Sequence, residues 1–249
     1  MEDKKKQWEE TQLKWDDKDF LKYKANALMK KRWARLNKKI SRIIADEVVE
    51  QNGYITMLDI GAGHGEFFGE VKDIVKRYVG IEPSEAMLEF DINEEEYQLK
   101  RGAGEEIEYK DEFDAVLIKE VLDHCYDPQK VINNAYNALK PGGTLIVTLT
   151  NKDSYYKKLF RKKAMQLEEE HKDHLYNFNP AETAELFNKA GFNSVKIMST
   201  NYLRLPYALE DALGKMPQGF VFGMLDLTDA IGTFFLDKKG GSFTVTGKK

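Results

Sequence analysis

The stretch MLDIGAGHGEFF, residues 57–68, places glycine at every second position, as Gly61, Gly63 and Gly65. Glycine permits positive φ angles and lets the backbone approach a ligand closely, although it costs backbone entropy. A plain tight turn between a strand and a helix needs only one or two glycines. The spacing therefore favours a loop shaped around a ligand over a purely structural turn.

A second chemical feature is Glu82, which ends the next predicted strand, RYVGIE. Ligands of open parallel sheets bind beyond the carboxyl ends of the strands. The two oxygens of a carboxylate at that place can accept hydrogen bonds from both hydroxyls of a ribose. On its own Glu82 would be read as a surface acid, but together with the glycine loop it predicts a ribonucleoside site.

The spacing of the glycines distinguishes a dinucleotide site from a site for a cofactor without a diphosphate. A dinucleotide fingerprint is G-x-G-x-x-G, whereas this loop is G-x-G-x-G and has Glu66 where the third glycine would stand. An acid at the start of a helix would repel a diphosphate. A cofactor that carries a sulfonium and an amino acid tail fits better, and Asp59 is placed to meet the ammonium of that tail.

These residues need a scaffold, and strands alternate with helices from residue 54 onward. This alternation predicts an α/β fold, a Rossmann-like doubly wound and mostly parallel sheet with helices on both faces. The predicted strands are YITMLDI, RYVGIE, YQLKRG, FDAVLIKE, TLIVTLT, NSVKIMST and SFTVTGKK. The predicted helices are EFFGEVKDIV, PSEAMLEFD, PQKVINNAYNALK and PAETAELFNKAGF.

The first 50 residues hold neither glycine nor proline, and they predict a helical extension. Residues 51–249 are predicted to form the main domain, with 151–179 as an inserted, lid-like segment. Trp8 and Trp15 share one helix face, and we expect them to pack on the main domain; capping of a pocket is the alternative. Four cations of the extension are expected to form a solvated face, namely Arg35, Lys38, Lys39 and Arg42.

Composition narrows the class of protein. The net charge of −4 in 249 residues gives no general reason to expect binding to nucleic acid or to an anionic membrane. The single cysteine, Cys125, excludes an internal disulfide and favours a reducing, cytoplasmic location. No apolar run is expected to approach the roughly 20 residues that cross a bilayer, and the charged N-terminus lacks the apolar core of a signal peptide.

Four segments, LDIGAGHGEF, VGIEPSEAML, FDAVLIKEVLDHCYDP and LKPGGTLIV, resemble successive motifs of the class I S-adenosylmethionine-dependent methyltransferases. The similarity is greatest to the small-molecule group called type 11. It is strong over residues 55–150 and weaker over FNPAETAELFNKAGFNSVKI. It implies a seven-stranded sheet whose last strand is antiparallel. It is specific for the cofactor and says little about the methyl acceptor.

The resemblance also implies roles for individual residues. Glu82 would hold the ribose, Pro83 and Met87 the adenine face, and Gly104 and Glu105 the adenine edge. The loop residues under the methionine part would be Asp59, Gly61, Ala62, Gly63 and Gly65, with Lys119 at the mouth of the site. Family members often have an aspartate where this chain has Ala103, which leaves backbone contacts to read the adenine.

The methyl acceptor is expected near the end of the fourth strand and under the insert. Asp123 and His124 would face the sulfonium or the acceptor, with His124 as a general base, although alignment alone can drive methyl transfer. Tyr155, His174 and Tyr176 are predicted to bind the acceptor. Other candidates in the insert are Tyr156, Phe160, His171 and Phe178. No set of metal ligands is predicted.

The sequence thus predicts an enzyme that transfers a methyl group from S-adenosylmethionine to a small molecule, at oxygen in preference to nitrogen or carbon. One alternative is a cofactor-binding module without chemistry of its own, which docks or forms a homodimer through residues 1–50. Another is an RNA methyltransferase that uses the basic face of the extension.

Overall fold

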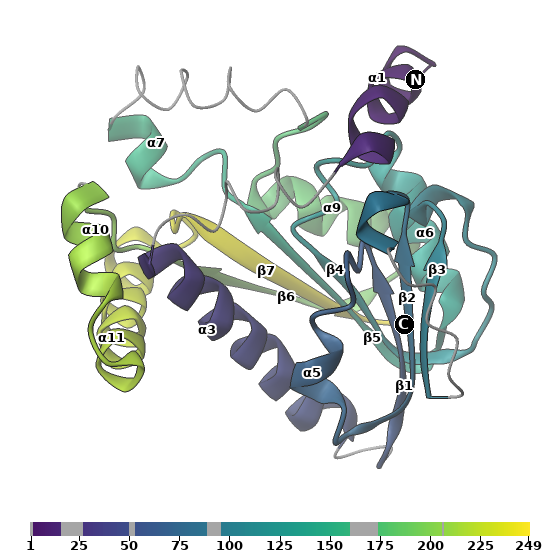
Figure 1. Ribbon diagram of the computed structural model, residues 1–249, viewed down its shortest axis with the longest axis horizontal. Helices are drawn as coiled ribbons and strands as arrows, with labels where there is room; N and C mark the ends of the chain where they lie inside the picture. Colours follow the sequence, from purple (N-terminus) through teal and green to yellow (C-terminus); the bar gives the residue numbers. More distant parts are fainter. Residues whose placement is uncertain (1, 16–26, 50–52, 89–95, 160–173, 206) are drawn as a thin grey trace.

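A seven-stranded sheet forms the centre of the structure, a computed structural model that describes residues 2–15, 27–49, 53–88, 96–159, 174–205 and 207–249 (Figure 1). The strand order is β3-β2-β1-β4-β5-β7-β6. Only β7 runs against its neighbours, β5 and β6. The strands are β1 (Ile55–Ile60), β2 (Val75–Glu82), β3 (Tyr97–Arg101), β4 (Phe113–Lys119), β5 (Leu139–Thr150), β6 (Asn193–Thr200) and β7 (Ser242–Lys248). All seven predicted strands and the antiparallel last strand are confirmed.

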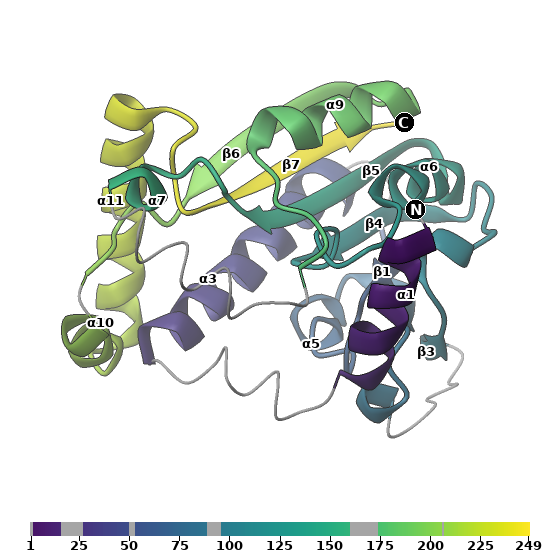
Figure 2. The same cartoon turned by 90° about the horizontal axis from the view of Figure 1, so that it is seen from above.

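The sheet is covered on both faces because its central strands are apolar on both faces. In β4, Ala115 and Leu117 pack toward α3 (Ala27–Ile44) and α5 (Phe68–Val71). Val116 and Ile118 pack into the opposite cluster, with α6 (Pro128–Ala138) and α9 (Pro180–Ala190). Figure 2 shows these two helix pairs on opposite sides of the sheet.

Two predicted helices are confirmed with their end signals. In α6, Pro128 stands in the first turn and the Asp127 side chain accepts a hydrogen bond from the backbone amide of Lys130. In α9, Asn179 and Glu182 form a capping box, and Gly191 ends the helix in a left-handed conformation. Both helices cover the same face of the sheet, and α6 connects β4 to β5.

Two other predicted helices are much shorter than expected. The helix at 66–75 reduces to the four residues of α5, because Gly69 weakens it and the β-branched Ile74 and Val75 lead into β2. Of the helix predicted at 83–91, the described residues 83–88 form only the 3₁₀ turn η3 (Ala86–Leu88), and its last three residues lie outside the described part.

The described parts of the first 50 residues are mostly helical, and the first helical segment ends at Trp15. The first segment is α1 (Glu2–Thr11) with the 3₁₀ turn η1 (Gln12–Lys14), and Trp15 leaves the helix with ψ 132°. The second is α3, which continues as a π-helical turn η2 (Ala45–Val49). Ile40 and Ile44 of α3 are fully buried against the sheet, so this helix belongs to the core that supports the site.

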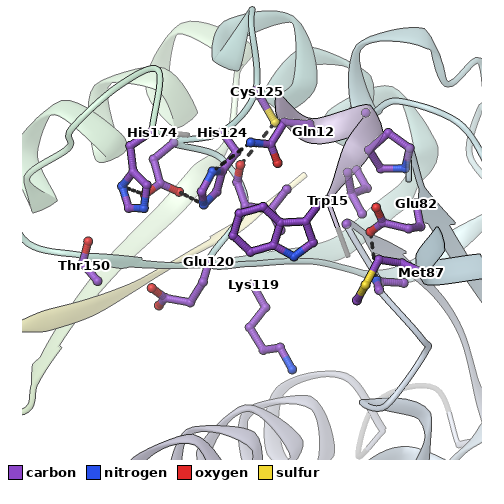
Figure 3. Close-up of a pocket in the computed structure, with 18 of the residues that line it drawn as sticks. Gln12, Trp15, Glu82, Met87, Lys119, Glu120, His124, Cys125, Thr150 and His174 are labelled. Carbon is purple, nitrogen blue, oxygen red and sulfur yellow. Dashed lines mark hydrogen bonds and ion pairs between the residues drawn. The ribbon is translucent and has the colours of Figure 1, made fainter. Parts of the chain in front are cut away.

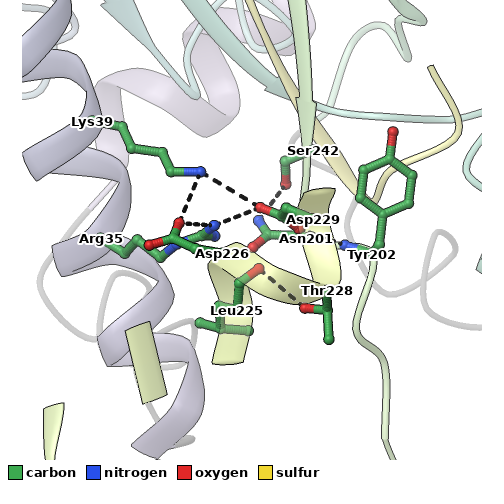
Figure 4. Close-up of polar contacts among 9 residues, drawn as sticks. All are labelled: Arg35, Lys39, Asn201, Tyr202, Leu225, Asp226, Thr228, Asp229 and Ser242. Carbon is green, nitrogen blue, oxygen red and sulfur yellow. Dashed lines mark hydrogen bonds and ion pairs between the residues drawn. The ribbon is translucent and has the colours of Figure 1, made fainter. Parts of the chain in front are cut away.

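The prediction of a solvated basic face is wrong for Arg35. This residue is 4% exposed and contacts Asp226 and Asp229 of α11 (Gln218–Leu236) at 2.6 and 2.7 Å. Lys39 lies 3.4 and 3.6 Å from the same two carboxylates (Figure 4). The acids come from the far end of the chain, so helical periodicity near Arg35 could not reveal them.

Helix α11 corrects a second expectation. It is long and apolar enough to cross a bilayer by length and composition, although the sequence was expected to hold no such segment. One side of it, with Val221 and Leu225, is buried next to α3 and α10 (Tyr207–Gly214). The opposite side exposes large apolar residues, namely Phe220, Leu227, Ile231, Phe234 and Phe235.

Candidate active site

A cavity of about 310 Å³ lies at the carboxyl ends of β1, β2 and β4, within the size range of small-molecule sites. Figure 3 shows ten of the residues around it, labelled. Its lining includes most of the predicted site residues, namely Gly61, Ala62, Gly63, Glu82, Pro83, Met87, Gly104, Glu105, Lys119, Asp123, His124 and His174. The described lining does not include Asp59, Gly65, Tyr155 or Tyr176.

Glycine is favoured at the three loop positions by positive φ angles, and at two of them also by close neighbouring side chains. Gly61, Gly63 and Gly65 have φ angles of +76°, +55° and +73°. A Cβ on Gly61 would lie 2.4 Å from the Cγ2 atom of Val121, and one on Gly65 would lie 1.9 Å from the Tyr97 hydroxyl. Gly63 has open space at this position apart from Met87 at 3.4 Å. Gly65 therefore serves the turn, whereas Gly61 and Gly63 face the cavity.

Glu82, the predicted ribose ligand, lies at the edge of the cavity. Its two oxygens accept hydrogen bonds from the backbone amides of Gly63 at 3.0 Å and Ser84 at 2.9 Å. These bonds hold the carboxylate at the edge of the glycine loop, where it lines the cavity. Burial raises the pKa of Glu82, and the two amides act in the opposite direction. Each oxygen keeps a second lone pair for a hydroxyl donor.

Asp59 lies beneath the loop. One of its oxygens accepts a hydrogen bond from the Tyr78 hydroxyl, and burial raises its pKa. The other oxygen is buried and meets no hydrogen-bond donor within the described chain. A buried acceptor in this state is costly unless a donor reaches it. An ammonium above the loop, directly or through a water, would satisfy it, so the site fits a cofactor with an amino acid tail.

The part of the cavity predicted to hold the adenine carries apolar side chains. Pro83, Met87 and Ala103 line it, and a Cβ on Gly104 would lie 2.8 Å from Ile60. The Glu105 carboxylate accepts a hydrogen bond from the Asp127 amide at 3.2 Å, and burial raises its pKa.

The N-terminal segment forms one wall of the cavity, which sequence reasoning gave only as the alternative. Trp8 packs edge-on against Tyr126, with 5.4 Å between ring centroids, and also lines the cavity. The Trp15 carbonyl accepts a hydrogen bond from the Ser84 hydroxyl at 2.6 Å, which fixes this segment to the end of β2. The two tryptophans therefore do both: they pack on the domain and they close the cavity.

Lys119 and Glu120 point in different directions from the end of β4. Lys119 Nζ lies 3.2 Å from Asn37 Oδ1 and over the rings of Trp33 and Phe67. Glu120 adopts a φ of +55°, a conformation that is uncommon for non-glycine residues. Burial and the charge of Asp123 raise the pKa of Glu120 to about 7.

Asp123 lies between two imidazoles. His174 Nδ1 is 3.1 Å from one carboxylate oxygen, and His124 Nε2 is 4.0 Å from the other. Burial opposes ionisation, but the two imidazoles hold the pKa of Asp123 below its ordinary value. The donor atoms of these three residues lie within 4.8 Å of one another, a spacing that could also hold a divalent ion.

Backbone hydrogen bonds bring His174 into the site from the insert. The Asp123 carbonyl accepts hydrogen bonds from the amides of Leu175 at 2.9 Å and Tyr176 at 3.1 Å. The Tyr176 hydroxyl donates to the Tyr126 carbonyl at 3.2 Å. Tyr176 thus fixes the segment instead of lining the cavity.

Other residues of the insert have structural contacts or lie outside the described part. Tyr155 is held by a hydrogen bond from its hydroxyl to the Tyr202 carbonyl. Phe178 packs in the core with Phe187 and Phe192. Phe160 and His171 belong to the residues that the structure does not describe.

Cys125 is among the residues that line the cavity, but its thiol is buried. It is 4% exposed and packed in the core cluster, and its Sγ lies 3.5 Å from the Val121 carbonyl. Burial and the nearby acids raise the pKa of this thiol well above its ordinary value. It is therefore an inert packing residue.

Comparison with known proteins identifies the class. The fold and the glycine loop with Glu82 are those of the class I S-adenosylmethionine-dependent methyltransferases. Residues 25–197 match the methyltransferase domain family, and because this match covers more than half of the chain, the protein belongs to that family. S-adenosylmethionine is the cofactor of this class.

The sequence relatives include an N-methyltransferase and an O-methyltransferase. An uncharacterized protein of Methanocaldococcus jannaschii is 32% identical over 57% of this chain and 67% of its own length. Phosphoethanolamine N-methyltransferase 2 of Caenorhabditis elegans is 30% identical over 57% of this chain, but the match spans 33% of that protein. Ubiquinone biosynthesis O-methyltransferase of Bradyrhizobium diazoefficiens is 28% identical, and the match covers 41% of this chain and 42% of the relative.

Solved structures share the fold. A possible histamine N-methyltransferase of Thermotoga maritima superposes with a TM-score of 0.56 at 23% identity, covering 88% of this chain and 90% of that one. Phosphoethanolamine N-methyltransferase 2 of Haemonchus contortus, solved with S-adenosyl-L-methionine, gives 0.54 at 18% identity, over 81% of this chain and 51% of that one. These likenesses concern the fold alone.

Proposed function

We propose that this protein transfers the methyl group of S-adenosylmethionine to a hydroxyl oxygen of a small-molecule acceptor. The observation that carries the proposal is Asp123, buried between His174 and His124 beside the end of β4. The cofactor supplies an activated methyl group on a sulfonium, which becomes a thioether when the methyl leaves. The acceptor hydroxyl loses its proton to the protein.

The proton acceptor is His174 in this proposal. Asp123 accepts the Nδ1 hydrogen of His174, which makes Nε2 the basic nitrogen of the ring and stabilises the imidazolium after transfer. This proposal replaces His124, the base expected from the sequence, with His174, because His124 is farther from the carboxylate. Glu120, with a pKa of about 7, supplies a second proton acceptor at the same wall.

The choice of oxygen follows from this set of bases. A neutral amine attacks a sulfonium without prior loss of a proton, whereas a hydroxyl is a weak nucleophile until its proton is removed. Because the relatives include both O- and N-methyltransferases, the acceptor atom is a proposal that rests on the site. The RNA alternative loses support, since two of the four cations it relies on, Arg35 and Lys39, contact acids inside the protein.

The cofactor site is tested by calorimetric titration with S-adenosylmethionine and its demethylated product. We expect Glu82→Ala to weaken binding of both at least tenfold, about 1.4 kcal/mol, because the ribose hydroxyls lose their acceptor. Glu85→Ala is the matched control, since Glu85 is exposed and pairs with Arg101. Equal affinities of the Glu82 variant and the wild type would remove the ribose assignment.

The reaction is expected to need no metal ion. Turnover should persist after dialysis against EDTA, since the imidazoles and carboxylates can take the proton themselves. The measurement is the rate with and without added Zn²⁺ or Mn²⁺, together with metal analysis of the dialysed protein. Loss of activity on dialysis, with one equivalent of ion bound by the wild type but not by His174→Ala, would instead assign Asp123, His124 and His174 to a metal.

A further inference from the structure

Two arginines line the part of the cavity that lies away from the glycine loop. Arg32 comes from α3, and Arg204 comes from the segment that follows β6. In the sheet, β6 is the edge strand opposite β3, whereas the predicted ribose ligand ends β2. The pair is therefore placed on the acceptor side of the cavity.

Arg32 is buried with part of its hydrogen-bonding capacity unused. Its side chain is 3% exposed. The Nη2 atom donates to the Leu203 carbonyl at 2.7 Å and to Glu210 Oε1 at 2.8 Å. The Nε and Nη1 atoms have no acceptor within the described structure. Buried guanidinium hydrogens without acceptors are costly, so this arrangement points to an acceptor that arrives with a ligand.

The charges around the pair do not balance. Glu210 is the carboxylate that contacts Arg32, and it is the acid whose charge also acts on Arg204. Burial and the like charge of Arg32 lower the pKa of Arg204 to about 10. The guanidinium carbon of Arg204 lies 6.0 Å from the centre of the Tyr156 ring. Among the described residues, Arg32 and Arg204 thus share the negative charge of Glu210, so the pair keeps an excess of positive charge.

Polar side chains beside the two arginines add a further hydrogen-bond donor to this wall of the cavity. Asn201 and Ser242 line the same wall, and the Asn201 side-chain amide donates to the Ser242 hydroxyl at 3.1 Å. A hydroxyl that accepts such a bond can still donate its own hydrogen. The wall therefore presents two guanidinium groups and one hydroxyl donor toward the cavity.

We propose that Arg32 and Arg204 form an oxyanion subsite that binds a phosphate or carboxylate group of the methyl acceptor. The inference rests on the proposed function and names its substrate class, an anionic hydroxyl compound. The planar fork of a guanidinium matches both oxyanions with paired hydrogen bonds, which a lysine cannot do. The bound anion would supply acceptors for Nε and Nη1 of Arg32 and neutralise the excess charge.

The test is titration with inorganic phosphate, and separately with acetate, of protein saturated with S-adenosylhomocysteine. Saturation fills the place of the cofactor's own carboxylate. We expect at least one of the two anions to bind, and Arg204→Gln to weaken it tenfold or more. Lys189→Gln, which removes an exposed charge on α9, should bind as the wild type does. The affinity for S-adenosylhomocysteine should stay within twofold in all three proteins.

Several results would overturn the subsite. These are no binding of either anion, equal binding by Arg204→Gln, or competition between phosphate and S-adenosylhomocysteine with weaker cofactor binding in the variant. The last would assign the arginines to the cofactor. If Arg204→Gln does not fold, Arg204→Lys is the second variant. It keeps the positive charge but loses the planar guanidinium, and it should still weaken binding of the anion. Failure of the wild type to bind S-adenosylhomocysteine would instead contradict the proposed function.

Discussion

Asp123→Asn is expected to lower kcat about 100-fold, at the lower end of what general bases contribute. The neutral amide cannot stabilise the His174 imidazolium that forms when the acceptor hydroxyl loses its proton. The pH profile should change as well. In the wild type, ionisation of Glu120, the second proton acceptor beside His174, should contribute a rise of kcat/KM with pH through about 7.

The variant should move that rise to lower pH. The negative charge of Asp123 raises the pKa of Glu120, so its removal lets Glu120 ionise at lower pH. The measurement is kcat/KM from pH 5 to 9 with an acceptor found by screening anionic hydroxyl compounds. Asp127→Asn is the control, because asparagine caps a helix as well as aspartate does. An unchanged rate and an unchanged profile would show that Asp123 has no part in proton transfer.

Arg35→Met is expected to lower the free energy of unfolding by about 3 kcal/mol, the range found when one partner of a buried ion pair is removed. Asp229 would then keep its buried charge without a close cation among the described residues, since Lys39 lies 3.6 Å away and the Tyr202 amide, at 3.1 Å, is neutral. Urea unfolding followed by circular dichroism gives the value. The effect should be confined to stability, because Arg35 is absent from the described lining of the cavity.

Arg42→Met is the charge-matched control for this measurement, since Arg42 is exposed on the same helix. It should change stability by less than about 0.5 kcal/mol. The double variant Arg35→Met with Asp229→Asn should recover part of the loss, because the buried anion is gone. Equal stabilities of Arg35→Met and Arg42→Met would mean that the ion pairs of Arg35 with α11 contribute nothing to the free energy of unfolding.

The cofactor half of the site could be predicted because its residues are close in sequence. Gly61, Gly63 and Glu82 lie on two adjacent strand ends, and the βα rhythm that brings them together is visible in apolar runs. The spacing of these residues in the sequence was therefore enough to predict that they lie close together. Asp59 and Gly65 belong to the same motif but act from below the cavity, a distinction that depends on the side chains of Tyr78 and Tyr97.

On the acceptor side, Asp123 and His174 were predicted as separate candidates, but their pairing and the place of Arg204 could not be predicted in the same way. His174 reaches Asp123 through hydrogen bonds made by a segment 51 residues later, and Arg204 reaches the cavity from beyond β6. Trp15 lines the cavity because the Ser84 hydroxyl binds its carbonyl, a contact between residues 69 positions apart. Such pairings depend on tertiary packing, which the periodicity of apolar residues along the sequence does not indicate.

The seclusion of Cys125 has a practical consequence for spectroscopy. With one cysteine in the chain, and that thiol both buried and poorly ionised, maleimide and iodoacetamide reagents should react slowly with the native protein. A cysteine introduced at an exposed position of α1 would then take a fluorophore or spin label at one place, without prior removal of the native thiol. Distances from the N-terminal wall to the rest of the domain thereby become measurable while the cofactor and the anion are added in turn.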